Sequence, residues 1–524
     1  MSLADEADVI VVGSGPAGIS AAWPLVEAGV RVLMLDAGTA PLPPSPEHAT
    51  LAEWRADPVR WEAELGTRGL LAETELSPKF ATPLARATLA GFAETAGLDA
   101  AGYVAVGSLA AGGLSRIWGA LAARYSAADL AEVPEGADIE ASYAHVSRRI
   151  GTSGGEDLAD ADLAAFTPPV AHLVARHRDI PAKPGFSLVT APNAVLRERR
   201  DERLGCTACG LCLHGCARGS IYHSALELPA LRRHRNFMYH GGVRVERLAG
   251  APGMQVLEAR IGIEAVRFRA PIVILAAGTL ATTSLALRRL DLTGVPVRLL
   301  SNPVGGMAFV VPHLVGRALP KRSFGLGQLF YTLQPEPGVE AAGVVYGADT
   351  LPLGAVADRL PFTRPVALRT ARALAPALLL ATSYLPGRFS DNRLTVEDDG
   401  AFGLIRIDGR QTAQAEQLLR GAFADLRRRT QTRGAWGVPG SLQILPPGAD
   451  AHPAGTLPMN GTGLAATLAD GALAGAPGVF VADGAALPLL SARHPTLTIM
   501  ANADRIGRSL ARRFAMTPSI AHAR

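Results

Sequence analysis

The chain has 524 residues, more than a single hydrophobic core ordinarily accommodates, so its length predicts two or more domains. Apolar residues make up 48% of the sequence and charged residues 19%, a composition that excludes an intrinsically disordered protein. The formal net charge is only +4, and the sequence contains no dense basic run with interleaved aromatic residues. We therefore expect no nucleic acid among its partners.

The first stretch, MSLADEADVIVVGSG, has acidic residues where a secretory signal peptide would have basic ones. We therefore expect a cytoplasmic protein. A subunit without a signal could also be exported while bound to a partner that carries one, so a periplasmic location stays open.

The segment 7–38 has the pattern of a dinucleotide-binding βαβ unit. The apolar run Val9–Val12 predicts a buried parallel strand, and VRVLMLD predicts a second strand that ends at Asp36. Asp36 could accept hydrogen bonds from a ribose, and the intervening helix would face the phosphates with its N-terminus. The glycine fingerprint between the strands consists of Gly13, Gly15 and Gly18.

Each glycine of this fingerprint has a physical reason. Gly13 permits the tight turn, Gly15 lets the backbone approach a pyrophosphate, and Gly18 lets helix and strand pack closely. The motif predicts a bound dinucleotide, but it does not separate FAD from NAD.

The middle of the chain contains fewer motifs. The most apolar stretch, 366–386, is interrupted by two arginines and Pro376, so we expect no membrane span there. It predicts a buried or amphipathic helix, or a surface that docks on a membrane or a partner subunit. Residues 390–408 predict two strands around a D-D-G turn, 411–432 predict a helix, and the proline-rich 41–48 predict a connector.

Two stretches near the C-terminus contain candidate catalytic histidines. AHPAGTLPM places His452 before a Gly-Thr turn. Further on, a strand predicted at 479–482 is followed by Asp483 and Gly484, and then His494 precedes Pro495. Proline is favoured at the first helical position, and an apolar stripe of helical period follows.

The boxes H-P-x-G-T-x-x-M and D-G…H-P-T-L-T-I resemble those of the glucose–methanol–choline (GMC) flavoprotein oxidoreductases. Residues 110–125 resemble the flavin-contacting Gly-Gly segment of that family, 243–248 the strand that touches adenine, and 270–287 the strand–turn–helix that returns to the FAD domain. The resemblance spans the chain and implies FAD as the cofactor. It also implies a mixed α/β fold similar to p-hydroxybenzoate hydroxylase, in which a Rossmann-like FAD-binding domain joins a substrate domain built on an antiparallel sheet.

The resemblance also implies roles for individual residues. His452 would accept the hydroxyl proton of an alcohol, and His494 would hydrogen-bond the alcohol oxygen. The helix that begins at Pro495 would point its positive end at the flavin edge that becomes anionic on reduction. Asp483 resembles the residue that contacts the ribityl chain. Further cofactor contacts are implied for Gly112, Gly113, Trp118, Val245, Ala277, Gly278, Gly484 and Thr496.

The four cysteines all lie within CTACGLCLHGC, at Cys206, Cys209, Cys212 and Cys216. Disulfides between such close neighbours would add little stability, and structural zinc usually uses two separated C-x2-C pairs. The spacing C-x2-C-x2-C-x3-C is that of bacterial ferredoxins and favours an iron–sulfur cluster over these alternatives and over a vestigial site. Because no remote cysteine exists to complete a cube, [3Fe–4S] is favoured over [4Fe–4S]. The insertion 203–222 and Trp118 also resemble GMC dehydrogenases that carry such a cluster.

We expect a discontinuous FAD-binding domain formed by 1–40, 80–130, 200–295 and 445–524, with the cysteine-rich insertion 203–222 inside it. Residues 296–444 would form the substrate domain, and 41–79 and 131–199 would be connecting or covering segments. The substrate would lie between the domains, over the flavin.

The leading functional hypothesis is an FAD-dependent dehydrogenase that oxidises a hydroxyl of a sugar or sugar-like alcohol, for example an aminoglycoside or glycoside. Its cluster would pass electrons singly to a quinone, a cytochrome or a ferredoxin-like protein. The first alternative is an oxygen-using alcohol oxidase whose cysteines bind zinc or no metal. A flavin-retaining lyase or isomerase and a non-catalytic electron-transfer or binding subunit are further alternatives, and the oligomeric state stays open.

Overall fold

The glycine fingerprint lies in a βαβ unit formed by β1 (Val9–Val12), α1 (Pro16–Glu27) and β2 (Val32–Asp36). Both strands consist of apolar residues up to Asp36, and all of them are buried, as expected for a parallel sheet that is covered on both faces. The computed structural model describes residues 7–38, 42–45, 50–56, 80, 82–134, 136–180, 184–351, 353–399 and 403–516.

This unit is the middle of a five-stranded parallel sheet with the order β19-β9-β1-β2-β5. The other three strands are β5 (Phe237–Gly241), β9 (Ile272–Leu275) and β19 (Val479–Val481). Strands that are hundreds of residues apart in sequence are therefore neighbours, so the dinucleotide-binding fold is assembled from separate segments of the chain.

Alternate residues of these strands pack on two different layers. One face packs against α1 and the long C-terminal helix α14 (Thr496–Met516), which lie side by side. The other face packs against α10 (Thr279–Arg289) and a three-stranded antiparallel sheet. That sheet consists of β6 (Val243–Ala251), β7 (Met254–Ile261) and β8 (Glu264–Ala270).

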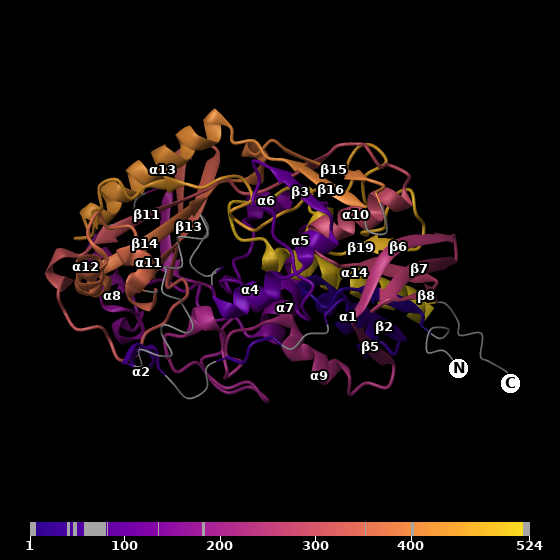
Figure 1. Cartoon of the computed structure of the whole chain (residues 1–524), viewed down its shortest axis with the longest axis horizontal. Helices are drawn as coiled ribbons and strands as arrows, with labels where there is room; N and C mark the ends of the chain where they lie inside the picture. Colours follow the sequence, from indigo (N-terminus) through magenta and orange to yellow (C-terminus); the bar gives the residue numbers. More distant parts are fainter. Residues whose placement is uncertain are drawn as a thin grey trace.

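A second, antiparallel sheet dominates the other half of the molecule, on the left of Figure 1. Its order is β17-β11-β14-β13-β12-β4, and a short strand, β18, also pairs with β11. Helices α8 (Pro168–Arg178) and α13 (Ala413–Gln431) cover one face. The strands are β4 (Phe186–Thr190), β11 (Val304–Val310), β12 (Leu329–Glu336), β13 (Val339–Gly347), β14 (Leu378–Tyr384), β17 (Trp436–Gly437) and β18 (Gln443–Ile444).

The segment 131–199 does more than connect elements. It contributes α7 (Gly136–Ile150), which packs on α14, and both α8 and the edge strand β4 of the antiparallel sheet. The proline-rich stretch 41–48 lies partly outside the described residues, and 42–45 have no regular structure. The shorter helices are α2 (Leu51–Ala56), α4 (Pro83–Leu89), α5 (Phe92–Thr95), α6 (Ala127–Ala131), α9 (Leu228–Leu231) and α11 (Leu353–Ala357).

A four-stranded sheet connects early and late parts of the chain. Its order is β10-β15-β16-β3. The two strands predicted at 390–408 are confirmed as the antiparallel pair β15 and β16, and the tip of their turn, 400–402, lies outside the described residues. The bounds are β3 (Leu98–Ala101), β10 (Val297–Leu299), β15 (Asn392–Glu397) and β16 (Leu404–Asp408).

The prediction of one helix over 366–386 is wrong in its second half. Helix α12 (Arg364–Leu374) ends where a short 3-10 turn contains Pro376, and the chain then continues as β14. β14 lies between β11 and β13, so its apolar run is that of an interior strand. None of the helices in the described part of the chain combines the length and apolar character that a membrane crossing requires.

Candidate functional site

A cavity of about 370 Å³ lies where the carboxyl ends of the parallel strands meet the antiparallel sheet. Its wall contains the glycine loop after β1, the turn after β9, the loop after β19 and the start of α14. Tyr384, the last residue of β14, closes it from the other half of the molecule. Its volume and its position at the strand ends are typical of a ligand site in an α/β sheet.

The glycine loop shows why two of its three glycines are required for packing. A Cβ on Gly13, whose φ is +101°, would lie 2.5 Å from the carbonyl oxygen of Ala276. A Cβ on Gly18 would lie 1.9 Å from the carbonyl oxygen of Gly13, so only glycine fits there. A Cβ on Gly15 would meet nothing within 4 Å, because Gly15 faces the open cavity. The open side of Gly15 leaves room for a ligand to approach the backbone at the start of α1.

Asp36 lies at the end of β2, with both carboxylate oxygens against the backbone. Its Oδ2 accepts a 2.7 Å hydrogen bond from the Ser14 amide, and its Oδ1 accepts a 2.8 Å bond from the Gly38 amide. Burial raises the pKa of this carboxyl. The side chains of Ser14 and Tyr239 also hydrogen-bond this carboxyl, which lies at the cavity wall.

The segment predicted to contact the flavin lies across the glycine loop. The amide of Gly112 donates a 2.9 Å hydrogen bond to the Ser14 hydroxyl, so Gly112 holds this segment in place without lining the cavity. Gly113 and Trp118 line the cavity, and the Trp118 indole donates a 2.6 Å bond to the carbonyl of Tyr222. Predicted contacts that also line the cavity are Val245, Ala277, Gly278, Gly484, Pro495 and Thr496.

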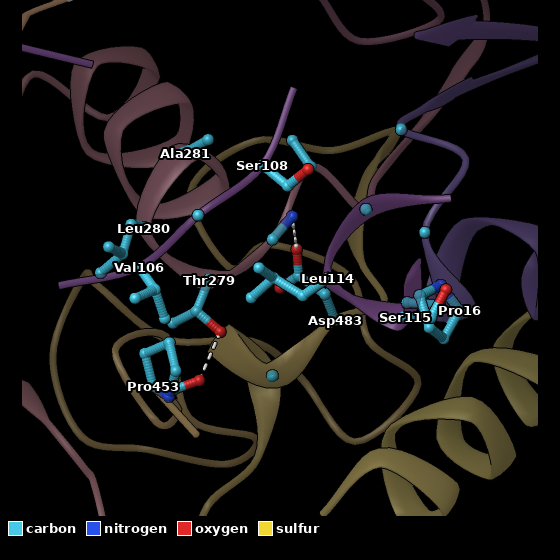
Figure 2. A pocket seen from close by; sticks show the side chains of 18 of the residues that line it. Pro16, Val106, Ser108, Leu114, Ser115, Thr279, Leu280, Ala281, Pro453 and Asp483 are labelled. Carbon is cyan, nitrogen blue, oxygen red and sulfur yellow. Dashed lines mark hydrogen bonds between the residues drawn. The ribbon is translucent and has the colours of Figure 1, made fainter. Parts of the chain in front are cut away.

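Asp483 joins the loop after β19 to the turn after β9 and to helix α10. Its Oδ2 accepts bonds of 2.9 Å from the Gly278 amide and 2.5 Å from the Thr282 hydroxyl, and its Oδ1 accepts one from the Ala485 amide. Burial raises the pKa of this carboxyl to about 6. Thr279 in turn donates to the carbonyl of Pro453, as Figure 2 shows. Asp483 therefore holds the turn after β9, and that turn holds the loop that contains His452.

The two histidines predicted as catalytic lie next to each other in the cavity wall. The ring centroids of His452 and His494 are 5.0 Å apart, and the ring planes are inclined by 74°. The ring of Tyr384 lies 4.6 Å from that of His494 and 5.8 Å from that of His452. Helix α14 begins at Thr496, one residue later than predicted, so its N-terminus lies at the cavity just after His494.

His452 has two polar neighbours beneath it. Its Nδ1 lies 3.0 Å from Oδ1 of Asn302 and 3.7 Å from Oδ2 of Asp450. Burial raises the pKa of Asp450 to about 7. Sequence reasoning missed Asn302, Asp450 and Tyr384. Only Asp450 carried a signal, a carboxylate two residues before the candidate base.

Comparison with known proteins finds similarity in several parts of the chain. A GMC oxidoreductase family model matches residues 389–503, and an FAD binding domain model matches residues 6–51. Paromamine 6′-oxidase from Streptomyces fradiae is 27% identical over 295 residues, which are 54% of this chain and 49% of that protein. These matches show that the C-terminal part of the chain is similar to GMC oxidoreductases.

Two other matches have narrower meaning. The crystal structure of pyridoxine 4-oxidase from Mesorbium loti superposes with a TM-score of 0.60 at 17% identity, covering 97% of this chain and 99% of that one, which shows a shared fold. Thiamine thiazole synthase from Aeropyrum pernix is 67% identical over only 31 residues, 6% of this chain and 12% of that protein. This chain matches only about half the length of the paromamine oxidase.

The FAD-binding model separates the two dinucleotides that the glycine motif leaves open, in favour of FAD. The structure offers a site that fits this cofactor. The space beside Gly15, the carboxyl of Asp36 and the helix start at Thr496 all belong to one cavity. They would hold the pyrophosphate, the ribose and the electron-accepting edge of the ring system respectively.

The prediction of a metal centre at the four cysteines is not supported by the structure. All four are free thiols, and the described part of the chain contains no group of three or more His, Cys, Asp or Glu side chains that could hold a metal. Cys209 packs with Leu51, Trp54 and Leu211, whereas Cys206 and Cys212 pack on the main core. Burial raises the pKa of both the Cys206 and the Cys212 thiol.

The cysteines also do not line the main cavity. Cys212 and Cys216 line a separate pocket of about 60 Å³, which shares Trp118 with the main cavity. The described residues therefore give no support to an iron–sulfur cluster or a zinc ion at the cysteines. We therefore assign no step of the reaction to a metal.

Proposed function

We propose that this protein is an FAD-dependent oxidoreductase that converts a hydroxyl group of a sugar or sugar-like alcohol to a carbonyl. The observation that carries the proposal is the pair of imidazoles, His452 and His494, in the wall of the cavity that the dinucleotide motif also lines. A purely structural pair of histidines would not need to meet at the end of the cofactor cavity.

Oxidation of an alcohol removes one proton from oxygen and one hydride from carbon. His452 accepts the hydroxyl proton, since an imidazole is a base near neutral pH without large tuning. His494 binds the same oxygen and holds the carbinol carbon in position. When bound, FAD supplies the acceptor for the hydride.

The surroundings of the imidazoles support a polar ring compound as substrate. Tyr346 and Tyr384 from the antiparallel sheet line the cavity together with the two histidines, and the Tyr384 ring lies beside both imidazoles, so a substrate would meet aromatic rings next to imidazoles. The match to a paromamine 6′-oxidase supports an aminoglycoside or related sugar alcohol within this class.

The acceptor that reoxidises the enzyme separates two modes of action. In the dehydrogenase mode, a quinone, cytochrome or ferredoxin-like protein takes the electrons directly. In the oxidase mode, oxygen takes them. The match to paromamine 6′-oxidase favours the oxidase mode.

A single experiment tests the proposal and separates the modes. Purified enzyme is mixed anaerobically with a panel of sugar alcohols, aminoglycosides and simple alcohols, and flavin bleaching is followed. Reduced enzyme is then divided between oxygen and a soluble quinone. Bleaching by at least one sugar-like alcohol supports the proposal, whereas bleaching by none of them contradicts it.

A further inference from the structure

We propose that Asn302 and Asp450 are positioning residues: Asn302 fixes His452 in the tautomer whose Nε2 accepts a proton, and Asp450 stabilises the imidazolium that results. The inference rests on the proposed function, because it presumes that His452 is the base. The two residues come from the loop before β11 and from the loop before His452 itself.

The orientation of the Asn302 amide follows from its other hydrogen bonds. Its Nδ2 donates 2.7 Å bonds to the carbonyls of Leu385 and Ser491. Only the NH2 end of an amide can donate, so Oδ1 is the end that lies 3.0 Å from His452 Nδ1. Asn302 is only 1% exposed, so turning the amide over would leave two buried carbonyls unpaired.

This orientation determines the tautomer of the base. Because Oδ1 of Asn302 can only accept, Nδ1 of His452 must be the protonated nitrogen. In a neutral imidazole the other nitrogen then carries the lone pair. Nε2 of His452 is therefore the proton acceptor, and Asn302 prevents the tautomer in which that position already carries a hydrogen.

Asp450 cannot contact a substrate, because its side chain is 0% exposed. Its Oδ2 accepts a 2.7 Å hydrogen bond from the backbone N–H of Asn302 and lies 3.7 Å from His452 Nδ1. Its Oδ1 has no hydrogen-bond partner among the described residues. A buried carboxylate with spare acceptor capacity, this close to an imidazole, favours the protonated form of that imidazole.

The two phenols that face Asp450 are uncharged near neutral pH. Tyr103 from the loop after β3 and Tyr384 from the end of β14 both face it, and burial raises the pKa of both phenols well above the usual value. His494 lies beyond Tyr384 and His452. In the described part of the chain, no arginine or lysine forms an ion pair with Asp450, so His452 is the cation with which its charge is paired.

The first experiment reads the tautomer directly, without substrate. The full-length enzyme is labelled with 15N-histidine, and the His452 resonances are assigned by their loss in His452→Gln. We expect Nδ1 of His452 to be protonated in the neutral wild type and a mixture of tautomers in Asn302→Leu. A wild-type His452 protonated at Nε2 would overturn the role of Asn302.

The second experiment tests the effect of the Asp450 charge with the variant Asp450→Asn. This substitution keeps the shape of the side chain and its hydrogen bond from the backbone N–H of Asn302. We expect the pKa of His452, read from the same resonances, to fall by about one unit or more, the scale for a charge within 4–6 Å. The acid limb of flavin reduction should shift by the same amount, and the plateau rate should fall. An unchanged His452 pKa would overturn the role of Asp450.

Asp349→Asn is the matched control, because Asp349 is also a buried carboxyl with a raised pKa, bonded to Ser323 and absent from the cavity wall. It should leave the His452 resonances unchanged. A different result would contradict the proposed function itself. In that case the flavin of His452→Gln would be reduced at the wild-type rate, and this outcome does not depend on the resonances of the other variants.

Discussion

The hydroxyl of Thr279 donates a 2.7 Å hydrogen bond to the carbonyl of Pro453, the residue that follows the candidate base His452. Thr279 is the first residue of α10, and the turn before it is bonded to Asp483 after β19. The position of the base is thus determined by two strands of the parallel sheet, although His452 itself lies in a loop. A rigid sheet that positions a catalytic loop is the expected construction of such a site.

Thr279→Val removes this bond and keeps the shape of the side chain. We expect a loss of about 1 kcal/mol in the free energy of unfolding, the usual net value of one hydrogen bond. Flavin reduction should slow by about tenfold, because a misplaced catalytic group is costly. Thr430→Val, which removes a comparable bond in α13, should cost similar stability but leave the rate unchanged. Equal rates in both variants would contradict this role of Thr279.

The glycine loop predicts opposite outcomes for two neighbouring substitutions. Gly15→Val should give a folded protein that has lost FAD, because its φ of −62° suits any residue and its Cβ would enter only the cavity. Gly18→Val should not fold, because its Cβ would lie 1.9 Å from a backbone oxygen. Circular dichroism and the flavin content after purification test both. A Gly15→Val protein with full FAD would place the cofactor elsewhere.

The cysteine arrangement predicts four free thiols in each chain. Protein purified anaerobically and unfolded without reductant should react with about four equivalents of a thiol reagent and contain little iron. The ferredoxin-like spacing instead predicts about three or four irons per chain. Elemental analysis of the same sample distinguishes free thiols from a cluster. Iron at that level would contradict the free thiols and support an iron–sulfur cluster.

The buried carboxyls predict how stability depends on pH. The pKa of Asp450 is about 7 and that of Asp483 about 6, whereas an unfolded aspartate has a pKa near 4. Between these values the native state binds more protons than the unfolded state, so the contribution of both groups to stability is lost as pH rises through about 6 to 7. Denaturant unfolding of the apoprotein from pH 4 to 8 should show this decline. Asp450→Asn should reduce it, and an equal decline in that variant would contradict the assignment.

The sequence was sufficient where local pattern determines structure. Val9–Val12 and Ile272–Leu275 are uninterrupted apolar runs, because both faces of a parallel sheet are covered. The apolar run within 366–386 led to a wrong prediction of one helix. An apolar run alone cannot distinguish a buried helix from an interior strand such as β14.

The candidate site was predictable from the sequence only where its residues lie in motifs. His452 and His494 lie in recognisable boxes, and the structure brings them within 5.0 Å of each other. Asn302 is 150 residues from His452 in sequence, and the antiparallel backbone bridge between Leu300 and Ala454 brings the two loops together. The direction of each cysteine also depends on tertiary packing: Cys209 turns toward Trp54, a contact that no spacing encodes.

The most direct test is anaerobic reduction of the bound flavin by a sugar-like alcohol in wild type and in His452→Gln. We expect both proteins to contain FAD. The rate of flavin reduction in the variant should fall by about 10²-fold or more, the usual scale for a lost general base. Reduction at the wild-type rate would show that His452 does not accept the hydroxyl proton, and the proposed function would lose its base.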